Sequence, residues 1–195
     1  TTPLIGMVDT AVLGHMGSSH YLAGAAIASL ILTQTYWLCG FIRMSSTGLS
    51  AQAKGQQDGH SKSRVFWQSC SVALVLGLAI WAAHKPLLAM GIHFAQPETQ
   101  LLEVIQQYFS VRIAGAPAAL VNLAIIGWLI GQQKTTQVLY IQVFANLLNA
   151  GLSVLLVFVF DAGVKGVAVA SVVAEYSILL LGVWVAFNGM GLQKP

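Results

Sequence analysis

Between Asp9 and Arg43 the chain carries no aspartate, glutamate, lysine or arginine, and similar long apolar runs recur along the remainder. A helix needs about 20 mostly apolar residues to span the hydrocarbon core of a bilayer. Only 8% of the 195 residues are charged, whereas a soluble domain carries about 25% and uses them to cover its surface. The pattern therefore predicts an all-α integral membrane protein and excludes a soluble domain.

Six runs are long enough, or nearly so, to cross the membrane, which predicts a six-helix transmembrane bundle. The first run begins at Thr1 and is short, so we interpret it as a helix that lacks its start. Polar segments separate the runs, and the longest are residues 54–63 and the connector over residues 85–97. The predicted spans are residues 1–16, 21–53, 64–84, 98–131, 136–160 and 166–189.

The basic residues of the connecting segments predict how the bundle is oriented. Cytoplasmic segments of membrane proteins carry an excess of lysine and arginine. The segments after the first, third and fifth spans hold only Lys85 and Lys165, so we expect the other set to be cytoplasmic. The basic residues form no dense patch of the kind that favours nucleic-acid binding. The predicted cytoplasmic residues are Lys54, Lys62, Arg64, Lys134 and Lys194.

Asp9 lies in the middle of the apolar sequence of the predicted first span. A carboxylate at the centre of a membrane costs about 2.5–3.5 kcal/mol to insert, and such residues almost always face a bundle interior or a water-filled cavity. They commonly mark ion pathways and proton relays. We therefore interpret Asp9 as the centre of a site that handles a cation or a proton.

Further polar side chains share helix faces within the other spans, because residues three, four and seven apart align on a helix. We expect them to converge with Asp9 on a polar pocket. Asparagine and serine also hold membrane helices together, and the charged residues can serve structure alone, so both interpretations stay open. The residues concerned are Arg43 with residues 45–47, Tyr108 and Arg112, Asn146, Asn149 and Ser153, and Ser171 and Glu175.

Several other kinds of site are not predicted. Cys39 and Cys70 lie inside apolar runs, which favours packing rather than a disulfide or a metal site. No two histidines have the spacing of metal ligands, and we expect no metal and no cofactor. Asp9 has no histidine partner within the predicted spans, and the sequence contains no Gly-x-Ser-x-Gly motif, so we do not expect an intramembrane enzyme.

Four segments resemble motifs of multidrug and toxic compound extrusion (MATE) transporters. Residues 8–17 (VDTAVLGHMG) resemble the first-helix motif, and residues 43–53 (RMSSTGLSAQA) resemble the end of the second helix in the DinF branch. Residues 131–135 (GQQKT) and 174–176 (AEY) are similar to the same branch. The resemblance covers essentially the whole chain and implies one lobe of a twelve-helix transporter with two six-helix lobes.

The resemblance implies that residues 1–195 form the amino-terminal lobe and that the second lobe is absent. The implied function is cation-coupled export of drug-like or toxic organic compounds by alternating access, across the cytoplasmic (inner) membrane of a bacterium. The implied partners are amphipathic or cationic small molecules, the lipid bilayer and the missing carboxy-terminal lobe. A flippase for lipid-linked precursors has a similar helix plan and stays an alternative, although only Arg43 and Arg112 supply basic charge within the spans.

The resemblance also implies the residues of a cation site. In the DinF branch this site uses residues that match Asp9, Tyr108 and Asn149, and a hydroxyl residue that matches Ser171. A fifth-helix aspartate of the branch falls here on Ser153, which removes one carboxylate. Sodium binding benefits from carboxylate charge, whereas a single buried aspartate can still bind a proton because burial favours its neutral form. We therefore expect H+ as the coupling ion, with Na+ as the alternative.

Overall fold

The computed structural model describes residues 11–15 and 19–190, except for the side chains of residues 189 and 190. Within these residues the chain is helical almost throughout and contains no strand, which confirms the all-α prediction. Residues 11–14 form one helical turn. A 3-10 turn, η1 (Ile113–Gly115), and a π-helical turn, η2 (Leu155–Val159), accompany the longer helices. The α-helices are α2 (Ser19–Leu38), α3 (Phe41–Gly55), α4 (Gly59–Ala82), α5 (His84–Ala95), α6 (Thr99–Arg112), α7 (Ala116–Gly131), α8 (Thr135–Val154) and α9 (Gly163–Met190).

Within the described part of the chain, five helical units are long and apolar enough to cross a membrane. They coincide closely with the five full-length spans predicted from the sequence, which are thereby confirmed. The predicted first span lies largely outside the described residues, and Asp9 lies outside them altogether. The five units are Ser19–Gly55, Gly59–Ala82, Thr99–Gly131, Thr135–Val159 and Gly163–Asn188.

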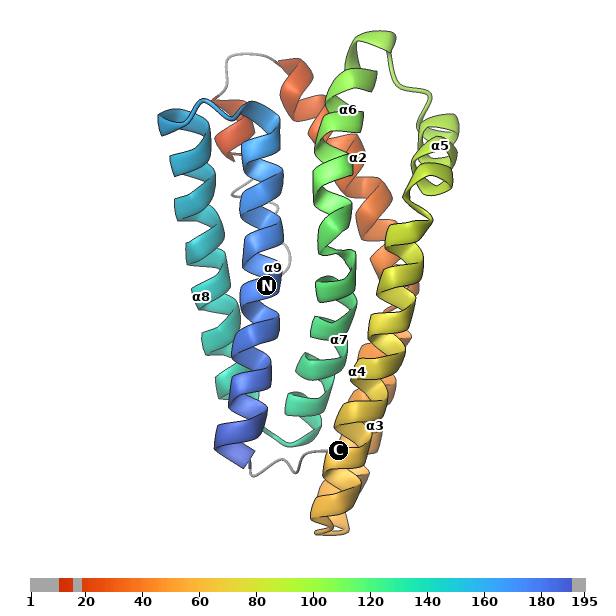
Figure 1. Cartoon of the computed structure of the whole chain (residues 1–195), viewed down its shortest axis with the longest axis vertical. Helices are drawn as coiled ribbons and strands as arrows, with labels where there is room; N and C mark the ends of the chain where they lie inside the picture. Colours follow the sequence, from red (N-terminus) through yellow and green to blue (C-terminus); the bar gives the residue numbers. More distant parts are fainter. Residues whose placement is uncertain (1–10, 16–18, 191–195) are drawn as a thin grey trace.

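The spans lie side by side along the long axis of the molecule (Figure 1). Helix α7 packs against α3, α4 and α9, so it occupies the middle of the bundle. Helix α6 precedes α7 in the same span and packs against α2 and α9, while α8 lies at one edge and packs mainly against α9. The unit formed by α6 and α7 is consequently the most buried of the five spans.

Two groups of buried residues form the core. The upper core group joins Val12 and Leu13 to α2, α6 and the start of α9. The lower core group joins α3, α4 and α7 to α8 and the end of α9, around the buried indole of Trp128. Large apolar side chains also remain exposed on α4, α8 and α9, as expected for helix faces that meet lipid.

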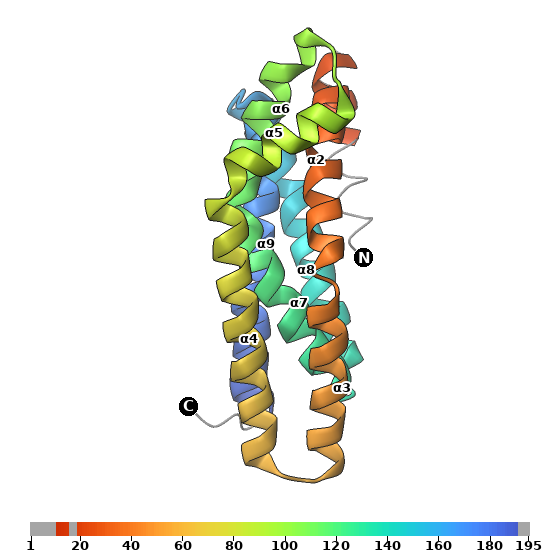
Figure 2. The same cartoon turned by 90° about the vertical axis from the view of Figure 1, so that its right-hand side faces the viewer.

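The connector predicted over residues 85–97 lies between the spans Gly59–Ala82 and Thr99–Gly131, and most of it is the helix α5. A proline in the first turn of a helix is tolerated, so Pro86 does not prevent it from forming. Gly91 allows a close approach to α2, since a Cβ at this position would run into the side chain of Ile31. Helix α5 crosses the top of the bundle at a slant (Figure 2). Its apolar side chains that pack against the upper core group are Leu87, Leu88 and Ile92.

Two spans that were predicted as continuous helices are interrupted. Helices α2 and α3 meet at a turn over Cys39 and Gly40, and η1 separates α6 from α7. Pro117 accounts for η1, because proline has no N–H to bond the carbonyl of Ile113 four residues earlier and its ring crowds that carbonyl. Such a break leaves backbone carbonyl groups that need other partners.

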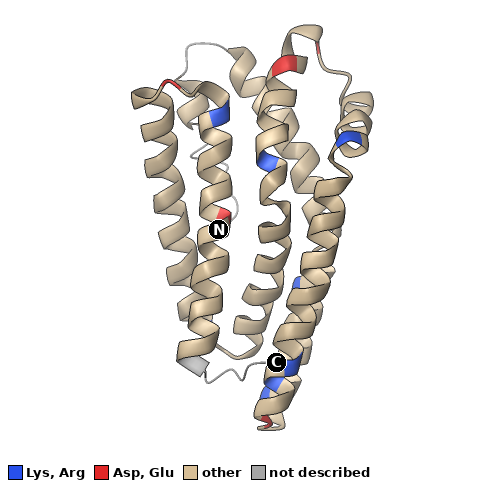
Figure 3. Cartoon of the chain, viewed as in Figure 1, with Lys and Arg blue, Asp and Glu red and all other residues tan. Residues whose placement is uncertain are grey.

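Charged residues lie mostly toward the ends of the bundle (Figure 3). Lysine and arginine gather at the lower end of α3 and α4. At this end Lys54 donates to the backbone carbonyl of Gln132 across 3.0 Å and to Oε1 of Gln133 across 2.7 Å, which ties α3 to the end of α7. The cytoplasmic orientation of this end stays a prediction.

Candidate functional site

Four of the five residues predicted to form the cation site are described, and all four are buried. The exposed fractions of Tyr108, Asn149, Ser153 and Ser171 are 1%, 0%, 0% and 1%. They come from three helices, α6, α8 and α9. The fifth residue, Asp9, lies outside the described residues. The roles of all five in cation binding stay predictions.

Asn149 and Ser171 join α8 to α9. The Nδ2 of Asn149 donates to the Oγ of Ser171 across 3.0 Å. Ser153 lies one turn farther along α8, and Asn146, one turn the other way, is only half-buried. Neither Asn149 Oδ1 nor Ser153 Oγ has a hydrogen-bond partner among the described residues. A buried acceptor or donor left unsatisfied costs about 1–3 kcal/mol, so these oxygens are suited to meet a cation, a proton donor or water.

Tyr108 connects the α6 side of the bundle to α2. The Oγ of Ser29 donates to the Tyr108 hydroxyl across 3.3 Å, and Tyr108 belongs to the upper core group with Val12 and Leu13. These two residues follow Asp9 by three and four positions, so the described end of the first span packs in the same group as Tyr108. Sequence analysis missed Ser29, because one serine in an apolar helix carries no signal beyond its polarity.

A second polar cluster, centred on an ion pair, connects α6, α7 and α9. The Nη1 of Arg112 lies 2.7 Å from Oε1 of Glu175, and the two side chains are only 14% and 12% exposed. Asn122, which sequence analysis missed, donates to the backbone carbonyl of Glu175 across 2.8 Å. The buried hydroxyl of Tyr36 on α2 has no hydrogen-bond partner among the described residues and lies within electrostatic range of the pair.

The polar residues around Arg43 lie on α3, and their convergence with Asp9, which lies outside the described residues, stays a prediction. Arg43 and Ser45 are exposed on α3. Thr47 donates to the carbonyl of Arg43 within its own helix. Ser46 is buried, but its Oγ donates to the carbonyl of Ala124 on α7 across 2.8 Å, and its role is therefore to join α3 to α7.

Helices α3 and α7 cross closely at small residues, which explains the position of Ser46. One turn farther on, the Oγ of Ser50 donates to the carbonyl of Trp128 across 2.8 Å. A Cβ at Gly127 or Gly131 would lie only 2.5 Å from a carbonyl oxygen of α3. Glycine and serine at such positions let two membrane helices approach closely.

The buried polar side chains of Tyr108, Asn149, Ser153 and Ser171, which we call the buried layer, offer oxygen atoms rather than the side chains of a transition-metal site. Within the described residues, no group of three histidine, cysteine, aspartate or glutamate side chains is placed to hold a metal ion. Cys39 and Cys70 are free thiols. Hydroxyl and amide oxygens are ligands that suit hard cations, and they also accept hydrogen bonds from a protonated carboxyl group.

A bundle of apolar helices around a buried polar layer defines a multi-span membrane protein. The MatE family model matches residues 1–155, and the chain belongs to this family. The resemblance to MATE transporters is thereby confirmed.

The chain is similar to DNA damage-inducible protein F of Escherichia coli (strain K12), with 38% identity over 182 residues that cover 93% of this chain and 40% of that protein. It is also similar to Protein DETOXIFICATION 44, chloroplastic, of Arabidopsis thaliana, with 30% identity over 204 residues that cover 99% and 39% of the two chains. The chain therefore spans less than half the length of these relatives.

The fold is similar to a solved structure of a multidrug resistance MATE family transporter of the MOP superfamily in an inward-facing conformation. The TM-score is 0.87, the identity is 19%, and the match covers 96% of this chain and 42% of that chain. The likeness confirms the fold class, one lobe of a MATE-type transporter. The assignment of residues 1–195 to the amino-terminal lobe stays a prediction.

Proposed function

We propose that this chain is the amino-terminal lobe of a cation-coupled exporter of drug-like or toxic organic compounds in the cytoplasmic (inner) membrane. The observation that carries the proposal is the pair of buried oxygens, Asn149 Oδ1 and Ser153 Oγ, which lack a hydrogen-bond partner among the described residues. The words detoxification and multidrug resistance in the names of similar proteins support the class of substrate. The chain covers less than half of each, and in this proposal a second lobe completes the transporter.

The coupling ion in this proposal is H+, carried by Asp9. The ligands in this proposal come from α6, α8 and α9 and are neutral hydroxyl and amide groups, those of Tyr108, Asn149, Ser153 and Ser171. A neutral Asp9 can donate to the Oδ1 of Asn149, whereas a charged Asp9 prefers water or a cationic substrate. The two protonation states thus favour different packings of the first span, which biases alternating access.

The energy for export comes from the membrane potential and the proton gradient. Each elementary charge that crosses the membrane contributes about 2.3 kcal/mol per 100 mV, so one proton per cycle supports export against a moderate gradient. Substrates are expected to be amphipathic or cationic, because an apolar pocket with few polar groups accepts many shapes. Na+ is the alternative coupling ion, since the oxygen ligands of the layer suit it as well.

Dye efflux from proteoliposomes that contain the transporter with both lobes tests the proposal. Wild type and Asp9→Asn are compared under a proton gradient alone and under a sodium gradient alone. Asp58→Asn is the matched control, because Asp58 is an exposed carboxylate at the start of α4 and asparagine preserves its role as the N-cap. We expect proton-driven efflux in wild type and the control, and none in Asp9→Asn.

Three other outcomes would contradict parts of the proposal. Proton-driven efflux that survives Asp9→Asn would remove Asp9 from the site. Efflux driven only by sodium would overturn the choice of H+ and make Ser153 an acceptable sodium ligand. No dye movement under either gradient would contradict drug export and favour a flippase for lipid-linked precursors.

A further inference from the structure

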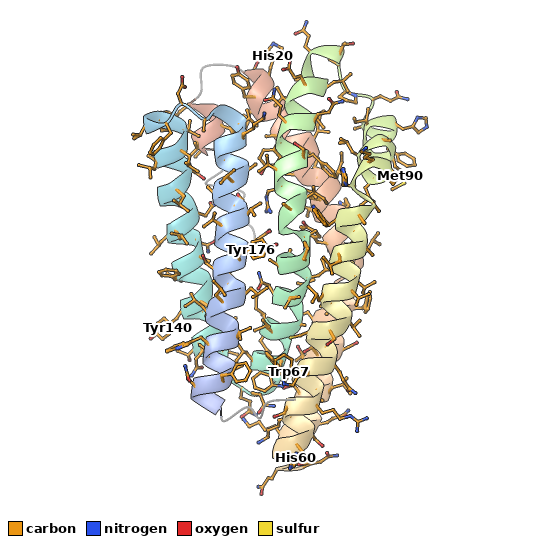
Figure 4. All side chains as sticks on the ribbon, viewed as in Figure 1. His20, His60, Trp67, Met90, Tyr140 and Tyr176 are labelled. Carbon is orange, nitrogen blue, oxygen red and sulfur yellow. The ribbon has the colours of Figure 1, made fainter. Side chains whose placement is uncertain are left out.

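The break in the span formed by α6 and α7 is held by two consecutive residues of α9. Glu175 pairs with Arg112, the last residue of α6, and its backbone carbonyl accepts the 2.8 Å bond from Asn122 on α7. Tyr176 donates its hydroxyl to the carbonyl of Ala114 inside η1 across 3.1 Å. Tyr176 lies half-way along α9 (Figure 4). We call the set Arg112, Asn122, Glu175 and Tyr176 the break clamp.

The break clamp contacts the chain before, within and after η1. Tyr176 satisfies one of the backbone carbonyls that the interruption leaves without a helical partner. Gly115 leaves room for the carboxylate of Glu175, because a Cβ there would crowd that side chain and displace it. The sequence thus combines a proline that breaks the span, a glycine that admits the carboxylate, and four side chains that join α9 to α6, η1 and α7.

The ion pair in the break clamp is not explained by stability alone. Replacing a buried ion pair by well-packed apolar residues is often neutral or stabilising, whereas removing one partner leaves a buried charge and is strongly destabilising. The pair does, however, favour one alignment of α6 against α9, because sliding one helix by a turn, about 5.4 Å, would separate the groups that now make a 2.7 Å contact.

This alignment bears directly on the candidate cation site. Helices α6 and α9 run in the same direction (Figure 1). Tyr108 precedes Arg112 by four residues, and Ser171 precedes Glu175 by four. Four residues of helix rise about 6 Å, roughly one turn, and return to the same face. The ion pair therefore places Tyr108 and Ser171 at the same level of the bundle, one turn away.

We propose that Arg112 and Glu175 are positioning residues that set the register of α6 against α9 and thereby hold Tyr108 level with the Asn149–Ser171 pair. This inference rests on the proposed cation site. Neither residue binds the coupling ion itself. Loss of the pair weakens the site because Tyr108 and Ser171 no longer keep their relative positions.

The first test measures register directly and needs no transport. Spin labels are attached at Ser110→Cys on α6 and Val173→Cys on α9, both exposed positions, in protein without its two native cysteines. Pulsed electron paramagnetic resonance gives the distance distribution between the labels. We expect one narrow distance with the pair intact, and a shifted or broadened distribution in Arg112→Gln and in Glu175→Gln.

The second test measures how tightly the coupling ion is held. Removal of groups that orient the ligands of a metal ion weakens its binding roughly ten- to hundred-fold, and we expect a similar rise in the ion concentration that half-saturates efflux in both variants. The KM for the dye should change by no more than about twofold, because the substitutions leave the contacts with the dye intact. Glu103→Gln is the matched control, because Glu103 is exposed on α6 and bonds only Gln107 among the described residues.

Variants that restore the charge or the ion pair distinguish a positioning role of Arg112 and Glu175 from a general loss of folding. Arg112→Lys keeps the charge, and the double exchange of Arg112→Glu with Glu175→Arg restores an ion pair of opposite polarity. We expect either one to recover the narrow distance and most of the ion affinity. Distances and ion affinities that match wild type in Arg112→Gln and Glu175→Gln would overturn the inference. If wild type transports no dye, the proposed function fails, while the distance measurement still decides whether the pair sets the register.

Discussion

Asn149 donates its Nδ2 to the Oγ of Ser171 in a buried bond of 3.0 Å between α8 and α9. The bond occupies a donor of the amide and leaves its oxygen, Oδ1, without a partner among the described residues. An amide in this orientation presents an acceptor to the interior of the bundle. Acceptors suit a cation or a protonated carboxyl group and do not suit an anion.

Ser171→Ala should weaken both the fold and the candidate site. The substitution leaves the buried Nδ2 of Asn149 unpaired, which is expected to lower the free energy of unfolding by about 1–3 kcal/mol. Thermal unfolding in detergent measures this change, and efflux at varied pH measures the affinity for the coupling proton. Ser177→Ala is the control on the same helix, because among the described residues Ser177 bonds only the carbonyl of Val173 one turn away. Equal melting temperatures for the two variants would contradict the importance of the bond.

Ser153→Asp should change the response to sodium. It supplies the carboxylate that the resemblance to the DinF branch implies one turn from Asn149, and the added negative charge favours Na+ binding. We expect a sodium gradient to drive dye efflux in this variant more strongly than in wild type. Asn146→Asp is the matched control, since it adds the same charge on the same helix at a half-buried position. A sodium response that is equal in the two variants would place Ser153 away from the ion.

Gly127→Ala should destabilise the crossing of α3 and α7. The added Cβ would lie 2.5 Å from the carbonyl oxygen of Arg43 and 3.1 Å from the Cβ of Ser46. Overpacking of this kind typically costs about 1–3 kcal/mol, and thermal unfolding in detergent would show it as a lower melting temperature. Gly48→Ala on α3 is the control, because a Cβ there meets nothing within 4 Å. Gly127→Ala protein that melts with the control would show that the crossing relaxes at little cost.

The stability of the start of α4 should depend on pH through Asp58, which lies outside the membrane spans. The hydroxyl of Ser61, and after it the backbone N–H of His60, hold the pKa of Asp58 below its ordinary value. Because the folded pKa is lowered, the carboxylate stabilises the start of α4 above the ordinary carboxyl range, and this contribution is lost as the pH falls through the folded pKa.

Ser61→Ala tests this assignment, because it should raise the pKa of Asp58 toward the ordinary value. An NMR titration of the carboxyl carbon measures the pKa. Ser110→Ala is the control, since Ser110 bonds a backbone carbonyl on α6. An unchanged pKa in Ser61→Ala would show that the Ser61 hydroxyl does not lower it and that the backbone N–H groups and His60 do.

The membrane spans could be predicted from sequence because the length of an apolar run is a local property. Residues 136–160 were predicted and Thr135–Val159 is observed. Local sequence did not predict structure that depends on packing against another helix. Residues 85–97 were predicted only as a connector, and their helix α5 places apolar side chains against the upper core group. The break at η1 follows from Pro117, which a reading of apolar length alone passed over.

Helical spacing indicated which polar residues share a face, and the family resemblance selected Tyr108, Asn149, Ser153 and Ser171, which are all buried. Spacing along one helix carries no information about distance to another. Only the packing of the helices showed that Ser46 bonds the backbone of α7, and that Arg112 meets Glu175, 63 residues away. The periodicity of a helix determines which side chains face inward. The side chains that they meet depend on the register between helices, which only the tertiary structure decides.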